Sequence, residues 1–377
     1  MLAKFDAVNI ICNCIKKIEK KYIILNLVVM IVLIIGVIII FNNYEWYDTT
    51  IVKIKRVESS LSNVQSGTEE KYYDQEISGI IMNGDFKGQS ASLKNEYSLS
   101  GVLDDKYKPG DEVFIKINAN DNGISGSILN LKRDKYMAIV LALFIFLLFV
   151  VTNKKGFFIF ISLFVNICVL WYALALNHKG YNILIISICL VLFFTFFSLI
   201  FISGLKKKTF VAILSTLISL FITMIIFKIF MIYTQGVDYT YMEYNTGQNS
   251  LSGLFLSQIL IGGMGAIMDV AITEASAINE LVNINKEISI KTLIKSGYEV
   301  GYDIMGTMIN ILLFTYICGI IPLIILKMKN NIKISTIVTQ IPMEIYGFMI
   351  GSIGVLLAIP ISLFTSIVIF KKLRRLI

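Results

Sequence analysis

Histidine is almost absent from this chain of 377 residues, which contains a single one, His178. A zinc site built on two histidines one helical turn apart is therefore excluded. The phosphate-binding pattern Gly-x-x-x-x-Gly-Lys-Ser/Thr is also missing, so any dependence on ATP would require a partner subunit. We expect no cofactor, and we expect His178 to be an exposed turn residue rather than a ligand.

Cysteine is scarce as well, with five residues in the chain and none between residues 42 and 135. A disulfide framework is therefore excluded for that stretch. Cys12 and Cys14 have no further ligands nearby, so we expect no metal there. The net charge of +8 could indicate nucleic-acid binding. The basic residues are not gathered into one patch with interleaved aromatic residues, however, so we expect no nucleic-acid partner.

Charged residues make up only 16% of the chain, whereas 56% of the residues are hydrophobic. This balance is typical of an integral membrane protein. Eight apolar runs are long enough to cross about 30 Å of hydrocarbon as helices, and they cover residues 23–41, 136–152, 157–176, 181–203, 209–232, 251–272, 304–326 and 345–370. The sequence predicts an α-helical integral membrane protein with about eight transmembrane helices and extensive contact with the lipid bilayer.

Lysine and arginine are distributed unevenly between the two sides of these predicted spans. Seventeen fall on the side that holds both ends of the chain, and four fall in short loops on the other side, Lys179, Lys327, Lys329 and Lys333. By the positive-inside rule, both termini are expected to be cytoplasmic.

Residues 42–135 differ from the rest, because they hold 15 of the 26 acidic residues and 12 of the 34 basic ones. Alternating stretches separated by Gly, Asp and Asn turns predict short strands, at residues 50–57, 75–81, 90–93, 96–102, 112–118 and 124–131. We expect a small extracytoplasmic β-rich domain, a barrel or a sandwich. The predicted regions are 1–22, a cytoplasmic N-terminus; 23–41, a transmembrane anchor; 42–135, the β domain; 136–232, four scaffold helices; and 251–377, three helices and a basic tail.

Polar residues return in the last third, as a stripe within the predicted span that begins at Leu251. Its members recur at spacings of three and four, which places them on one helix face: Gln258, Gly262, Gly265, Asp269, Thr273, Ser276, Glu280 and Asn283. Such a face is expected to meet protein, water or substrate rather than lipid tails.

The intramembrane carboxylates each have two interpretations. Asp269 is expected near the cytoplasmic boundary, where it either serves a function or is simply tolerated. Asp303 either serves the same site or caps the first turn of its helix. Glu274 points away from the stripe and Glu280 lies beyond the bilayer, so we expect both to face cytoplasmic water or Lys286 and Lys291. Glu344 follows Pro342 and is expected to cap its helix.

Two further helices carry patterned residues in this region. Asp303, Gly306, Thr307 and Asn310 share a face of the predicted seventh span. A small-residue track of the kind that lets helix backbones approach closely runs along the eighth span, through Gly347, Gly351, Gly354 and Ala358. We expect this track to serve helix packing.

Three blocks of this region resemble the YibE/F family of bacterial multi-pass membrane proteins, and they lie at residues 262–271, 301–310 and 351–360. The order of anchor helix, β domain and seven further helices is similar to that family too. The resemblance implies a bacterial cytoplasmic (plasma) membrane location, and it marks the three blocks as candidate functional sites. It implies no substrate.

The leading functional hypothesis is a transporter or permease-like protein for an ion or a small solute. Its binding site is expected between the last three spans, with contributions from Asp269, Asp303, Asn310, Thr273, Gly262, Gly265 and Thr307. The alternative is a non-catalytic assembly factor or sensor that acts through the β domain. Its partner would be an envelope or membrane protein, or a second copy of the same chain in a homo-oligomer. An intramembrane aspartyl hydrolase is a third interpretation, but Asp269 lacks the Gly-x-Gly-Asp context of that class, so we expect no enzyme.

Overall fold

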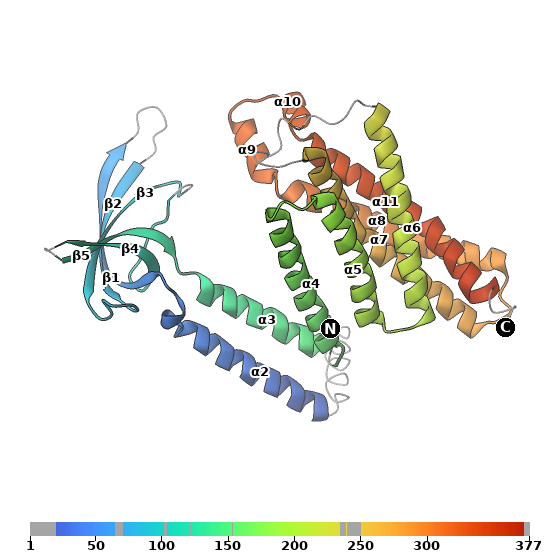
Figure 1. The fold of residues 1–377 in the computed structure, drawn as a ribbon, viewed down its shortest axis with the longest axis horizontal. Coiled ribbons are helices and arrows are strands. Elements are labelled where there is room, and N and C mark those ends of the chain that lie inside the picture. Colours follow the sequence, from blue (N-terminus) through green and yellow to red (C-terminus); the bar gives the residue numbers. More distant parts are fainter. Residues whose placement is uncertain are drawn as a thin grey trace, which may run out of the picture. The chain divides into compact units, whose positions relative to one another are not determined.

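The computed structural model describes residues 20–64, 71–101, 104–120, 123–152, 154–233, 239 and 250–372. The chain divides into two compact units, Met1–Gly156 and Phe157–Ile377, and Figure 1 shows the helices and strands of both. Nearly all of the predicted N-terminal region, residues 1–22, lies outside the described residues, together with Cys12 and Cys14.

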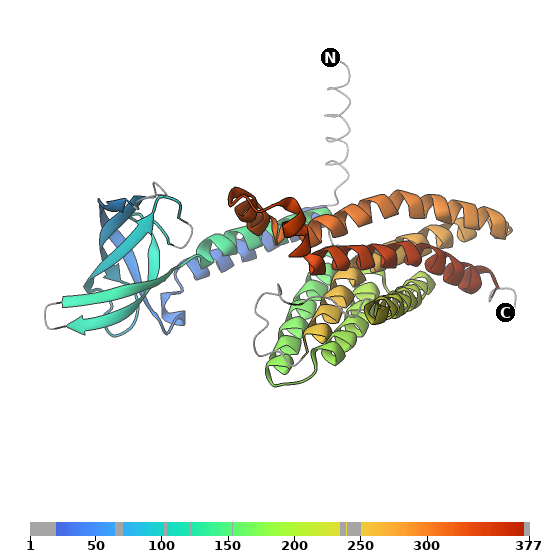
Figure 2. The same ribbon diagram turned by 90° about the horizontal axis from the view of Figure 1, so that it is seen from above.

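The first unit is a β domain inserted between two apolar helices. Its elements are α2 (Lys20–Phe41), the short 3-10 turn η1 (Tyr44–Trp46), β1 (Thr50–Val64), β2 (Lys71–Ile81), β3 (Ser90–Ser98), β4 (Glu112–Asn120), β5 (Gly123–Leu131) and α3 (Asp134–Thr152). The two helices pack against each other, and they lie side by side in both views (Figures 1 and 2). Most of their apolar side chains stay exposed, as expected of helices surrounded by lipid.

The five strands close into a barrel in the order β1-β2-β3-β5-β4. All pairings are antiparallel except the one between β3 and β5, which is parallel. Closure of the sheet leaves no free edge among the five described strands of this barrel. Of the two predicted architectures, barrel and sandwich, the barrel is therefore confirmed.

Alternation along the strands explains the core of this barrel. In β2, residues from Gln75 to Ile81 alternate between buried and outward positions, as a strand with one face in a core must do. The core cluster includes Val52, Ile54, Leu93 and Tyr107. The structure has one strand where the sequence predicts two, at residues 90–93 and 96–102, because β3 runs without a break from Ser90 to Ser98. Val102 lies outside the described residues.

The second unit is helical. Its elements are α4 (Lys154–His178), α5 (Ile183–Ser203), α6 (Lys207–Tyr233), α7 (Leu251–Ile284), α8 (Ile290–Cys318), α9 (Ile321–Lys329), α10 (Ile334–Thr339), α11 (Pro342–Ile367) and a π-helical turn, η2 (Val368–Lys372). Helices α5, α6, α7 and α11 form the core of the bundle, and α8 lies along α11 (Figure 2). Eight helices of the described chain are long and apolar enough to cross a membrane, which confirms the predicted number.

One helix boundary differs from the prediction in a way that matters for the site. The seventh span was expected at residues 304–326, but α8 begins at Ile290, where the Ser289 side chain accepts a hydrogen bond from the Thr292 amide. The first turns of α8 are amphipathic rather than apolar, so a search for apolar runs misses them. The helix then ends at Cys318, and α9 starts close to Pro322.

Candidate functional site

The predicted stripe does lie on one face of α7, the face that points away from the bundle core. Gln258, Gly262, Asp269, Thr273 and Glu280 are exposed in the single chain, whereas residues half a turn away are buried. The Thr273 hydroxyl donates to the Asp269 carbonyl oxygen at 2.7 Å, so it is satisfied within its own helix. Helix α7 extends to Ile284, so Asp269 lies in the helix interior rather than at its C-terminal end.

The polar residues of α8 share an exposed face as well. Asp303, Gly306, Thr307 and Asn310 all lie on it. The Thr307 hydroxyl donates to the Ile304 carbonyl oxygen at 2.7 Å, and the Asn310 amide donates to that of Gly306 at 2.9 Å. Asp303 lies 13 residues beyond the first residue of α8, so the capping interpretation for Asp303 is wrong.

The structure leaves these two polar faces separate. Within the described ranges, no hydrogen bond or ion pair joins Asp269 to Asp303, or either carboxylate to Asn310. Gly265 is partly exposed and has open space at the position of a Cβ atom. Gly262 is closer to a neighbour, because a Cβ atom there would lie 2.6 Å from the Tyr316 hydroxyl oxygen of α8.

The glycine track of α11 lies in the core of the bundle. Gly347, Gly351, Gly354 and Ala358 are all buried. A Cβ atom at Gly347 would lie 2.5 Å from the Tyr316 ring, and one at Gly354 would lie 2.6 Å from the Ile267 side chain of α7. A Cβ atom at Gly351 would meet Leu312 at 3.4 Å. The absence of side chains therefore lets α11 approach both α7 and α8 closely.

The sequence interpretation missed one carboxylate, Glu274 of α7. The expectation that it faces water is wrong, because Glu274 is fully buried. Among the described residues, neither of its carboxylate oxygens has a hydrogen-bond partner. The Ser362 hydroxyl of α11 lies beside it and donates to the Ala271 carbonyl oxygen at 3.3 Å. By contrast, Glu280, on the same helix, is exposed as expected.

Buried hydroxyl groups lie on α6 and α11, the two helices that pack most closely against α7. On α6 they recur every four residues, at Ser215, Ser219 and Thr223, and each donates to the carbonyl oxygen one turn earlier at 2.7 Å. Ser215 also shares a hydrogen bond of 2.5 Å with Thr365 of α11. This spacing in apolar helices is the signal that could have located the polar interior from the sequence.

The fold and its buried polar groups define a multi-pass helical membrane protein that carries a small β-barrel between α2 and α3. The family model of the YibE/F-like protein matches residues 140–372, and that of the YibE/F family N-terminal domain matches residues 45–131. The chain belongs to the YibE/F family, which confirms the resemblance found in its three sequence blocks. No curated protein and no solved structure matches it.

Proposed function

We propose that the helical unit transports an ion or a small solute across the membrane, and that transport depends on the Glu274 carboxylate. The single observation that carries this proposal is the full burial of Glu274 without an ion-pair partner among the described residues. Burial of an unpaired carboxylate costs several kcal/mol. Ionisable groups inside membrane helices mark ion pathways and proton relays, because only a function compensates for that cost.

The surroundings of Glu274 support an ion or polar solute as the transported species. Ser215 and Ser219 of α6 and Ser362 of α11 present buried hydroxyl groups to the same bundle interior. A hydroxyl group both donates and accepts, so it can exchange a hydrogen bond with its own helix for one with a passing ligand. Such an exchange requires little movement of the helix backbone.

The exposed polar faces of α7 and α8 form the second part of the proposal. Residues on these faces have to meet water or protein, because lipid tails offer no hydrogen bonds. We propose that these faces bind the ion or solute, as predicted from the sequence, through Asp269, Thr273, Gly262 and Gly265 of α7 and Asp303, Thr307 and Asn310 of α8. Location in the bacterial cytoplasmic membrane with both termini inside belongs to the same proposal.

The test is ion flux in liposomes that hold the purified full-length protein and a trapped pH-sensitive dye. A potassium diffusion potential, negative inside, drives proton entry, which is recorded alone and then with sodium, magnesium, phosphate or an amino-acid mixture added. We expect at least one condition to exceed the rate of empty liposomes, and we expect Glu274→Gln to lower that rate about tenfold or more. Glu287→Gln is the matched control, because Glu287 is exposed and lies beyond the end of α7.

Equal proton entry in wild-type and empty liposomes under every condition would contradict transport of these species. Equal rates in the wild type and Glu274→Gln would contradict the role of this carboxylate. Asp269→Asn and Asp303→Asn separate the two parts of the site, since loss of flux in these variants alone would show that the exposed faces of α7 and α8 act without Glu274.

A second candidate function is that of a sensor or assembly factor that acts through the barrel. It is favoured by the tight connection between the barrel and the start of α3, where Asp134 accepts hydrogen bonds from Asn43 at 3.2 Å and from Tyr47 at 2.8 Å. Replacement of residues 47–134 by a short linker separates the two candidates. A sensor loses its activity without the barrel, whereas a transporter retains measurable flux.

A further inference from the structure

A pocket of about 490 Å³ lies at the junction of the barrel with α2 and α3, within the first unit. Its size falls within the range of small-molecule sites. Its lining combines three apolar side chains of α2 with polar and charged groups of the junction, and consists of Val37, Ile38, Phe41, Asn42, Tyr44, Lys53, Glu112 and Lys135. One wall is therefore apolar and the other is charged.

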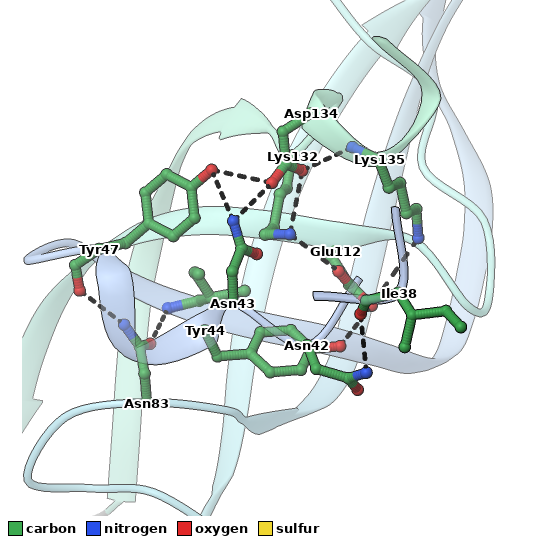
Figure 3. A network of polar contacts seen from close by, with 11 residues as sticks. Ile38, Asn42, Asn43, Tyr44, Tyr47, Asn83, Glu112, Lys132, Asp134 and Lys135 are labelled. Atoms are coloured by element: carbon green, nitrogen blue, oxygen red, sulfur yellow. Dashed lines mark hydrogen bonds and ion pairs between the residues drawn. The ribbon is translucent and has the colours of Figure 1, made fainter. Parts of the chain in front are cut away.

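A buried charge network stands behind the charged wall (Figure 3). The Lys132 ammonium group has no exposed surface and lies 3.0 Å from Asp134 Oδ1 and 3.7 Å from Glu112 Oε2. It also lies 5.4 Å from the centre of the Tyr44 ring and 5.6 Å from that of the Tyr47 ring, as in cation–π contacts. Lys132 thus offsets much of the negative charge of the two carboxylates from inside the protein.

Two further lysines line the pocket itself. Lys53 of β1 lies opposite Glu112 of β4 in the strand ladder, yet it forms no ion pair within the described ranges. Lys135 Nζ lies 3.7 Å from Glu112 Oε1, beyond hydrogen-bond distance, and the same oxygen already accepts a hydrogen bond of 2.8 Å from the Tyr44 hydroxyl (Figure 3). Three lysines thus face two carboxylates at the junction, and both pocket lysines keep free donors.

The position of the pocket along α2 suggests where it lies in a membrane. Val37, Ile38 and Phe41 belong to the last turns of an apolar helix, directly before the polar β domain begins. Trp46 and Tyr136, both strongly exposed, flank the junction. Exposed Trp and Tyr side chains next to the end of a membrane helix are typical of the level of lipid headgroups.

We propose that this pocket binds one anionic phospholipid, with its phosphate between Lys53 and Lys135 and its acyl chain along the α2 wall. The phosphate accepts charge-assisted hydrogen bonds from the two ammonium groups. The acyl chain accounts for the apolar wall, which a free phosphate ion would leave unused. The neutral Tyr44 hydroxyl and the Asn42 amide donate within the protein, to Glu112 and to the Ile38 carbonyl oxygen, so recognition of the anion falls to the lysines.

Native mass spectrometry of the full-length protein, stripped of lipid in detergent, tests this proposal. Dioleoyl phosphatidylglycerol is titrated against the wild type and against Lys53→Gln/Lys135→Gln. We expect the wild type to retain one tightly bound lipid and the variant to bind it about tenfold more weakly, because two charge-assisted contacts are lost. The matched control is Lys94→Gln/Lys116→Gln, which removes two exposed charges from the same barrel and leaves binding unchanged.

Equal retention of phosphatidylglycerol by both double variants would overturn the proposal. Diacylglycerol bound as well as phosphatidylglycerol would also overturn it, because that lipid lacks the phosphate. Inorganic phosphate that binds where phosphatidylglycerol does not would show an anion site without a lipid, and would overturn the assignment too.

Two further variants keep the test valid if the double glutamine variant does not fold. Lys53→Gln alone breaks no ion pair of the described chain, so it leaves the fold unchanged and is expected to weaken lipid binding severalfold. Lys53→Arg/Lys135→Arg keeps both positive charges and is expected to retain the lipid. Loss of the lipid in the arginine variant, together with retention in Lys53→Gln, would contradict the assignment of the phosphate to these side chains.

Discussion

The two units of this protein each bury an ionisable side chain, but they treat it in opposite ways. Lys132, at the base of the barrel, has Glu112 and Asp134 within 4 Å and two tyrosine rings around it. Glu274, inside the helix bundle, forms no ion pair within the described ranges, and the Ser362 hydroxyl lies beside it. A buried ionisable group with opposite charges beside it is part of the architecture, whereas one without an opposite charge indicates a group kept for another purpose. The predictions below test this contrast in order of decreasing effect on the free energy of unfolding.

The largest effect is expected from Lys132→Met, which removes the ammonium group beside the buried Glu112 and the partly buried Asp134. The free energy of unfolding of the full-length protein should fall by about 3–5 kcal/mol, measured by chemical denaturation followed through tyrosine fluorescence. Lys87→Met is the control, because Lys87 forms an exposed ion pair with Glu45, and its loss should cost less than about 1 kcal/mol. Equal losses in the two variants would show that the network does not hold the junction together.

The second-largest loss of stability is expected at the glycine track of α11, where close helix packing replaces ion pairs as the source of stability. Gly347→Ala places a Cβ atom 2.5 Å from the Tyr316 ring, so that ring or helix α11 has to shift. We expect a loss of about 1–3 kcal/mol, measured as a lower melting temperature in detergent. The matched control is Gly265→Ala, where the added methyl group meets open space. If both variants melt alike, close approach of the helices at Gly347 is not what stabilises the bundle.

A smaller effect is expected from Tyr44→Phe, which removes the hydrogen bond to Glu112 and costs about 1–2 kcal/mol at neutral pH. Burial, with the hydrogen bond to Glu112, raises the pKa of Tyr44 to about 12. The unfolded chain then loses this proton before the folded protein does, so wild-type stability falls as the pH rises from about 10 towards about 12. The phenylalanine variant should show a shallower fall in melting temperature between about pH 10 and about pH 12.

Tyr233→Phe provides the comparison for that pH series, because Tyr233 is strongly exposed. Its pH profile should follow that of the wild type. A Tyr44→Phe profile that also follows the wild type would mean that ionisation of Tyr44 does not contribute to the alkaline loss of stability.

The smallest effect on stability is expected at Glu274, where we expect the largest effect on flux. Glu274→Gln replaces a buried carboxylate that has no partner in the described part of the chain, so the melting temperature should stay the same or rise. A rise of up to about 1 kcal/mol in the free energy of unfolding, together with lost flux, is the pattern of a functional residue. A loss of several kcal/mol would instead make Glu274 a structural residue like Lys132.

The sequence was informative about the membrane helices because long apolar runs leave few alternatives. It was equally informative about the face shared by Gln258, Asp269 and Thr273, because helical periodicity determines which residues lie together. Periodicity does not determine which face points to the core, however. Glu274 is expected from the sequence to face water, but it is fully buried in the described chain.

The remaining errors have similar physical causes. Asp303 was assigned a possible cap because the apolar run begins at residue 304, whereas the helix begins at Ile290 with amphipathic turns. Lys132 lies within four consecutive charged residues that follow Leu131, and such a run usually indicates a solvated linker. Its burial depends on Tyr44, Tyr47 and Glu112, which are distant in the sequence and meet only in the folded barrel.

The barrel is connected to the membrane at two points, since the chain enters it from α2 and leaves it into α3. Asp134, the first residue of α3, is bound to Asn43 and Tyr47, which directly follow α2. A domain joined by a single linker could rotate freely above the membrane. Here two connecting segments are hydrogen-bonded to each other, and they prevent that rotation. Any torque on the barrel is therefore passed to the α2–α3 pair as a change in the angle at which the two helices cross.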